Sequence, residues 1–115
     1  MGSLYYANFS DPIEIPDRLL AHLKVVIATK LRRGESFTLS WRNLPSEGGR
    51  STLWLQPAIP LRFLFDGDEA EILNPAFMRE LAASANSSGG LAVALDREIP
   101  EVEDSRVGRM APATA

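Results

Sequence analysis

The stretch Asp17–Gly34, DRLLAHLKVVIATKLRRG, decides the fold because it is the clearest helix in the chain. Asp17 follows a proline and is a good N-cap residue, and Gly34 is a typical residue to end a helix. The apolar residues between them recur at helical spacing on one side: Leu19, Leu20, Leu23, Val26, Ile27 and Leu31. The spacing predicts an amphipathic helix whose apolar side faces the core.

The opposite side of this helix is predicted to be basic and exposed. At 100° per residue, it carries Arg18, His22, Val25, Thr29, Arg32 and Arg33. We interpret His22, the single histidine, as a solvated surface residue. Lys30, Arg32 and Arg33 occupy the last turn, where the helix dipole favours a cation by ~0.3 to 1 kcal/mol each. Helix termination explains this cluster without a ligand, and the alternative is a phosphate-binding stripe that adds Arg18 and His22.

Outside this helix the pattern changes to the two-residue period of strands. The expected strands are residues 3–8, 13–15, 36–42, 51–56, 61–65 and 91–95. A second helix is expected to begin at Asn74 and Pro75 and to end at the Ser-Ser-Gly-Gly turn. The order of elements predicts an α+β fold, with a mostly antiparallel sheet of five to six strands and two helices packed on one face.

One face of this sheet is expected to stay free of helices. It would carry Thr38, Ser40, Arg42, Trp54, Arg62 and Leu64, by alternation along the strands. An exposed tryptophan beside leucine and arginine is typical of an interface, so we expect Trp54 and Leu64 to contact a second copy of the chain, with pairing through this face or through an edge strand. Stacking of single-stranded bases on Trp54 beside Arg42 and Arg62 is the alternative, and a third interpretation is that arginine stems only shield the ring.

Composition favours one soluble domain. The 115 residues are 45% hydrophobic and contain no cysteine, which excludes disulfides, thiolate metal sites and cysteine nucleophiles. No leader and no membrane span is recognisable, so we expect a cytoplasmic protein. Residues 1–96 are expected to form a single globular α+β domain, and residues 97–115 a disordered tail that is acidic and then rich in alanine and proline.

Charge is uneven along the chain. The net charge is −3, but residues 18–62 hold eight basic and two acidic residues, which gives this middle part a charge of +6. Such asymmetry fits an anionic partner, or acidic flanks that cover the basic middle in the same molecule. The anion-binding hypothesis, for nucleic acid or phosphate, comprises Arg18, Lys30, Arg32, Arg33, Arg42 and Arg62.

No catalytic motif is present, and we predict no catalytic residue, metal or cofactor. A single histidine cannot supply an H-E-x-x-H site, and no G-x-S-x-G elbow occurs. The acidic run DGDEAE at residues 66–71 does not fit the spacing of a calcium loop. The run LPSEGGRS at residues 44–51 looks like the tail of a phosphate loop but lies between two strands, so we interpret it as a hairpin loop, with an anion-holding backbone nest as the alternative.

Three strings in the chain resemble one family. They are IEIPDRLLAHLKVVIATKLRRGESFTLSW at residues 13–41, GRSTLWLQPAIPLRFLF at 49–65 and LAASANSSGGL at 81–91. The chain resembles, over residues 2 to about 95, short actinobacterial proteins of unknown function that often carry the label ATP-dependent DNA ligase. Such a ligase needs a lysine in a K-x-D-G context, and neither Lys24 nor Lys30 has one. The resemblance therefore implies at most a DNA-associated accessory role.

Overall fold

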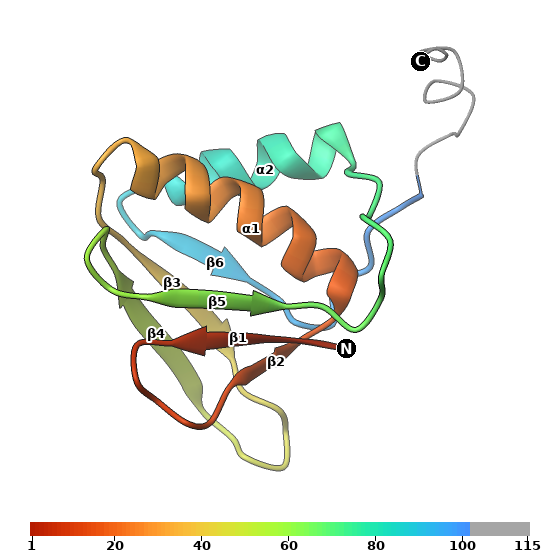
Figure 1. The fold of residues 1–115 in the computed structure, drawn as a ribbon, viewed down its shortest axis with the longest axis horizontal. Coiled ribbons are helices and arrows are strands. Elements are labelled where there is room, and N and C mark those ends of the chain that lie inside the picture. The colour runs from red at the N-terminus through yellow and green to blue at the C-terminus, as the bar shows by residue number, and fades with distance from the viewer. Residues whose placement is uncertain (102–115) are drawn as a thin grey trace.

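The structure, a computed structural model, describes residues 1–101 as two helices and six strands (Figure 1). In chain order they are β1 (Gly2–Tyr6), β2 (Ile13–Ile15), α1 (Asp17–Arg32), β3 (Phe37–Arg42), β4 (Arg50–Leu55), β5 (Leu61–Leu64), α2 (Pro75–Ala85) and β6 (Leu91–Val93). This order confirms the predicted α+β class. Most of the predicted tail, residues 102–115, lies outside the described residues.

The strands form two three-stranded sheets, so the prediction of one sheet of five to six strands is wrong. One sheet has the order β2-β1-β5 and is antiparallel, while the other has the order β4-β3-β6 and pairs β3 with β6 in parallel. Pro57 and Pro60 between β4 and β5 explain the division. Proline has no amide to donate to a ladder, so the chain turns away after β4, and β5 pairs with β1 instead.

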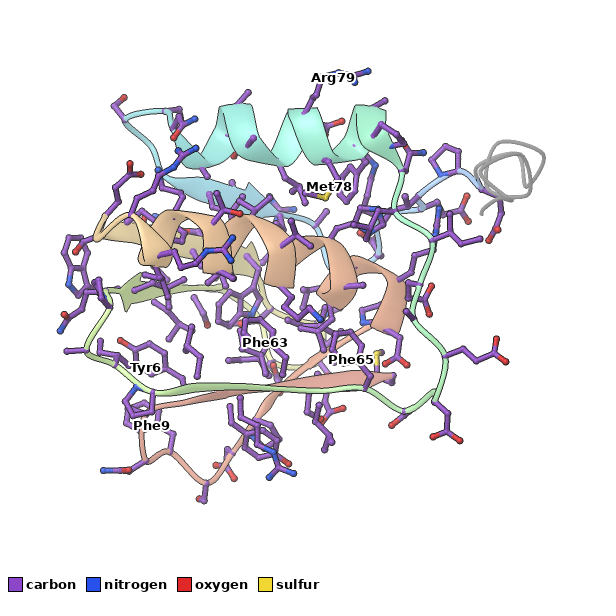
Figure 2. All side chains as sticks on the ribbon, turned by 45° about the horizontal axis from the view of Figure 1, so that its top comes forward. Tyr6, Phe9, Phe63, Phe65, Met78 and Arg79 are labelled. Atoms are coloured by element: carbon purple, nitrogen blue, oxygen red, sulfur yellow. The ribbon has the colours of Figure 1, made fainter. Side chains whose placement is uncertain are left out.

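One hydrophobic core joins both sheets and both helices. Its fully buried aliphatic side chains are Leu4, Ile15, Leu19, Leu20, Leu23, Ile27, Leu39, Leu55 and Leu91. Figure 2 shows Phe63 and Phe65 beneath α1 and Met78 between α1 and α2, and all three side chains pack against this core. The two helices therefore do not cover one face of a single sheet, as predicted. Instead, α1 shares one interior with both sheets and with α2.

The helix ends are explained by local chemistry, with one correction. Asn74 caps α2 as predicted, because its side chain accepts a hydrogen bond from the Phe77 amide at 3.1 Å. Asp17 is not the N-cap of α1, since it is already helical. Its carboxylate instead accepts the amides of Gly67 and Asp66 at 3.0 Å, and these bonds lower the pKa of Asp17. Within residues 1–101, no helix has the length and apolar character needed to cross a membrane.

Candidate functional site

The candidate site is the outer face of the β4-β3-β6 sheet. Alternation sends Phe37, Leu39 and Leu55 into the core, so their neighbours along β3 and β4 point outward. We define the outer face as Thr38, Ser40, Arg42, Arg50, Thr52, Trp54 and Ala92. All are exposed except the half-buried Thr38 and Ser40, so neither helix covers this face.

Cross-strand pairs organise the outer face. The register places Thr38 opposite Trp54, and Arg42 opposite Arg50. Ser40 and Thr52 lie between these pairs, and their hydroxyl oxygens are 2.9 Å apart. The Trp54 side chain is the most prominent feature, with 55% of its surface exposed. A bulky aromatic residue thus stands at one end of the face and two arginines at the other.

A pocket of about 340 Å³ extends the outer face beside Trp54. It lies at the ends of α1 and α2, and its lining includes Thr38, Lys30 and Asn86. Lys30 Nζ donates to Asn86 Oδ1 at 2.8 Å and pairs with Glu35 at 2.9 Å, so its charge is already balanced. The pocket therefore adds polar surface next to the tryptophan without adding net positive charge.

Arg62 and Leu64 do not lie on this face, although the sequence predicted that they share it with Trp54. Both are on β5, in the other sheet. Arg62 lies opposite Tyr5, with its guanidinium carbon 5.4 Å from the ring centre. Leu64, which is 38% exposed, lies opposite Ser3. The predicted placement is wrong because it assumed a single continuous sheet.

The predicted basic stripe on α1 is also not formed as a set of free cations. Arg18 donates to the carbonyl oxygens of Ile72, Ile99 and Pro100 at 2.7 to 3.1 Å. These bonds hold residues 99–100 against the start of α1. Lys30 is buried in the contacts described above, and it holds the pKa of Glu35 below its ordinary value. Arg32 and Arg33 are exposed at the end of the helix, where the sequence predicted a terminating cluster.

His22 is fully buried, so its interpretation as a solvated surface residue is wrong. Its Nε2 accepts the backbone amide of Asn74 at 2.8 Å, which leaves the ring proton on Nδ1, 2.7 Å from the Arg18 carbonyl oxygen. The ring also meets Phe77 edge-on, with centres 5.3 Å apart. Burial lowers the pKa of His22. A neutral histidine therefore joins α1 to the start of α2, which is a structural role.

The described residues hold no metal-binding cluster, and two amides of their glycine-rich loop are already hydrogen-bonded. Across residues 1–101, no group of three or more histidine, aspartate or glutamate side chains is arranged to hold a metal. The β3–β4 connection is a hairpin loop, as interpreted, and the amides of Glu47 and Gly48 already donate to the Leu44 carbonyl oxygen. Two of the amides that an anion nest would need are therefore already hydrogen-bonded within the loop.

The comparisons with known proteins identify a family. A family model described as domain of unknown function (DUF7882) matches residues 1–96. The chain belongs to the DUF7882 family. The match confirms the predicted membership of a family of unknown function, and the description of DUF7882 names neither a source group nor an activity. No curated protein and no solved structure matches this DUF7882 chain significantly.

Proposed function

We propose that the protein is a small, non-enzymatic, cytoplasmic interaction module that forms a homodimer through the outer face of the β4-β3-β6 sheet. The observation that supports this function is Trp54, which stands 55% exposed on a face that neither helix covers. Large aromatic side chains that project from a sheet cost solubility and are common at the centre of interfaces. A second copy would remove the ring from water.

The composition of the face fits a protein partner. Tryptophan and arginine are the residues most enriched among those that dominate binding, and the outer face carries one tryptophan and two arginines. Thr38, Ser40 and Thr52 provide small polar side chains beside the tryptophan and between it and the arginines. The face thus has an aromatic anchor at one end and a polar surface next to it.

Trp54→Ala is expected to raise the dimer dissociation constant at least about 30-fold, because a central interface tryptophan contributes about 2 kcal/mol or more. Sedimentation velocity over a concentration series measures this constant. Leu64→Ala is the matched control, since Leu64 is also exposed but lies in the other sheet. Wild-type protein that sediments as a 12.6 kDa monomer at every concentration would refute the homodimer.

Anion binding by the same face is the second candidate function. Arg42 and Arg50 lie opposite each other and are exposed, and within residues 1–101 neither forms a salt bridge. Like charges held together without an acidic partner are unfavourable unless an anion joins them. Such a site would suit the accessory DNA-associated role that the ligase label of the resembling proteins suggests, with no lysine adenylation by this chain.

For this second candidate, binding of a labelled single-stranded oligonucleotide is expected to weaken steeply between about 50 and 200 mM salt. Replacing both Arg42 and Arg50 with alanine should reduce the salt slope by about 1.4, since each lost phosphate contact contributes about 0.7. Replacing Arg32 and Arg33 together is the control, because they are exposed at the end of α1 and are not part of the outer face. Affinity that does not change with salt would rule this function out.

A further inference from the structure

β4 differs from the other strands that end a sheet. The edges of the two sheets are β2, β5, β4 and β6. β2 and β6 have three residues each and β5 has four, whereas β4 has six. β2 lies between Pro12 and Pro16, and the β6 amide of Ala92 is bonded to Ser84 Oγ. Proteins usually keep edge strands short or blocked to prevent pairing, whereas β4 is long, and within residues 1–101 only the Tyr6 hydroxyl bonds to the backbone of its free edge.

The phase of the β3–β4 ladder shows which backbone groups of β4 face this edge. The Asn43 amide donates to the Gly49 carbonyl oxygen at 2.9 Å, so these two residues form a hydrogen-bonded pair. Hydrogen-bonded pairs alternate with non-bonded pairs along an antiparallel ladder. The pairs that contain Arg50, Thr52 and Trp54 are therefore the non-bonded ones, and their backbone groups point away from β3.

Tyr6 confirms this direction. Its hydroxyl donates to the Trp54 carbonyl oxygen, which is possible only if that oxygen faces the edge. In the part of the chain from residue 1 to 101, this is the only hydrogen bond that reaches the edge side of Arg50, Thr52 or Trp54. A carbonyl oxygen has two lone pairs, so Trp54 retains capacity for a second donor. The edge thus presents a row of three amides and three carbonyl oxygens.

We propose that β4 pairs antiparallel with β4 of a second copy, centred on Thr52, to give a continuous six-stranded sheet with the order β6-β3-β4-β4-β3-β6. This inference rests on the homodimer proposed above, but it places the contact at the β4 edge of the outer face instead of across the face. Thr52 would face the partner's Thr52 as a hydrogen-bonded pair. The inward-facing backbone bonds to β3 would stay as they are, because the new bonds use only groups on the other side of β4.

The side chains of β4 favour a second copy of the same strand as the partner that pairs with its free edge. Thr52 lies midway between Arg50 and Trp54, so pairing centred on Thr52 places each Arg50 opposite the partner's Trp54 on the outer face. An arginine over a tryptophan ring is an attractive pair, and it forms twice. A register centred on Ser51 would instead make Arg50 and the partner's Arg50 diagonal neighbours, about 7 to 8 Å apart, which repels. The strand is therefore complementary to itself in one register.

A single introduced cysteine tests the register, because the chain contains none of its own. Residues in a hydrogen-bonded antiparallel pair have Cα atoms about 5.5 Å apart, which a disulfide can span. Thr52→Cys is expected to give a covalent dimer under mild oxidation, seen on a non-reducing gel. Ser40→Cys, one strand further in on the same face, would lie three strand spacings, about 14 Å, from its counterpart and should not crosslink.

Thr52→Pro tests the backbone bonds. Proline removes an amide that points to the edge and leaves the β3 ladder unchanged, and a dimer would lose two hydrogen bonds. We expect the dissociation constant to rise at least about tenfold, while Thr52→Val, which keeps the amide, stays near wild type. If Thr52→Pro fails to fold, the cysteine experiment decides alone.

The outcomes separate the two proposals. A wild-type dimer in which Thr52→Cys does not crosslink, or in which folded Thr52→Pro still dimerises as tightly, would overturn the β4 pairing and leave the face-mediated homodimer standing. A wild-type monomer at every concentration would overturn both. Crosslinking at Thr52→Cys but not at Ser40→Cys supports the pairing and its register.

Discussion

Replacing His22 with alanine is expected to lower the free energy of unfolding by about 3 kcal/mol. The ring is fully buried, and its removal leaves a cavity next to Phe77. It also leaves the Asn74 amide without the acceptor that it has at 2.8 Å. A buried amide without a partner costs about 1 to 3 kcal/mol by itself. Urea denaturation followed by tryptophan fluorescence measures the loss.

His22→Phe separates the two contributions. Phenylalanine keeps a ring against Phe77 but cannot accept the Asn74 amide, so it should recover packing and not the hydrogen bond. We expect its stability to lie between those of wild type and His22→Ala. A His22→Ala protein within about 0.5 kcal/mol of wild type, the range of ordinary surface substitutions, would contradict the structural role of this residue.

The pH dependence of the free energy of unfolding independently tests whether His22 is held neutral in the folded protein. Burial first, and then the charge of Arg18, lowers the pKa of His22, although the Arg18 carbonyl and Glu71 act in the other direction. The folded protein therefore binds fewer protons than the unfolded chain below the ordinary histidine pKa of about 6.5. Stability is fully present above that pH and falls as the pH decreases toward the pKa of the folded state.

In the pH window just below 6.5, the change in stability is due to this single histidine. Asp17, Glu35 and Glu80 also have lowered pKa values, but their ordinary values of 3.8 to 4.5 place their loss of stability at more acidic pH. Wild-type stability should decrease across the window, whereas His22→Ala and His22→Phe should show a flatter profile. Equal slopes in all three proteins would mean that His22 is not held neutral.

Local pattern was sufficient to predict the elements but not their partners. The helical spacing of Leu19, Leu23 and Ile27 marks α1, and the alternation around Trp54 predicted an outward side chain, which is 55% exposed. Pairing of β1 with β5 joins residues about sixty positions apart, and no local spacing encodes it. Pro57 and Pro60 were the available signal that β5 leaves the sheet of β4.

The long-range partners of the basic residues near the candidate site were likewise not predictable from local sequence spacing. A helical wheel assigns α1 one buried side, but α2 covers a second side and buries His22. The sequence did not reveal the bonds of Arg18, because its acceptors, the carbonyl oxygens of residues 72, 99 and 100, come from distant parts of the chain. Arg50 was missed as a site residue, although its pairing with Arg42 across the hairpin could have been read from the shared alternation.

Gly90→Ala is expected to lower the free energy of unfolding by about 4 kcal/mol. Gly90 is buried in the turn between α2 and β6 and has a φ of +80°, which costs a residue with a side chain about 1 to 2 kcal/mol. A Cβ there would also clash with Thr38 Oγ1 and lie 3.0 Å from the Thr38 carbonyl oxygen. Overpacking of this kind adds about 1 to 3 kcal/mol. Urea denaturation checks the sum.

Gly34→Ala is the matched control, because Gly34 has nearly the same φ, +76°, but nothing lies within 4 Å of its added Cβ. It should therefore lose only the backbone strain. The difference between the two variants measures how tightly the α2–β6 turn packs on β3. Adding Thr38→Ala to Gly90→Ala should recover part of the loss, since the hydroxyl is removed and the carbonyl remains. If Gly34→Ala and Gly90→Ala lose the same free energy of unfolding, the α2–β6 turn does not press against Thr38. The packing of β6 beside β3 would then be looser than their parallel pairing implies.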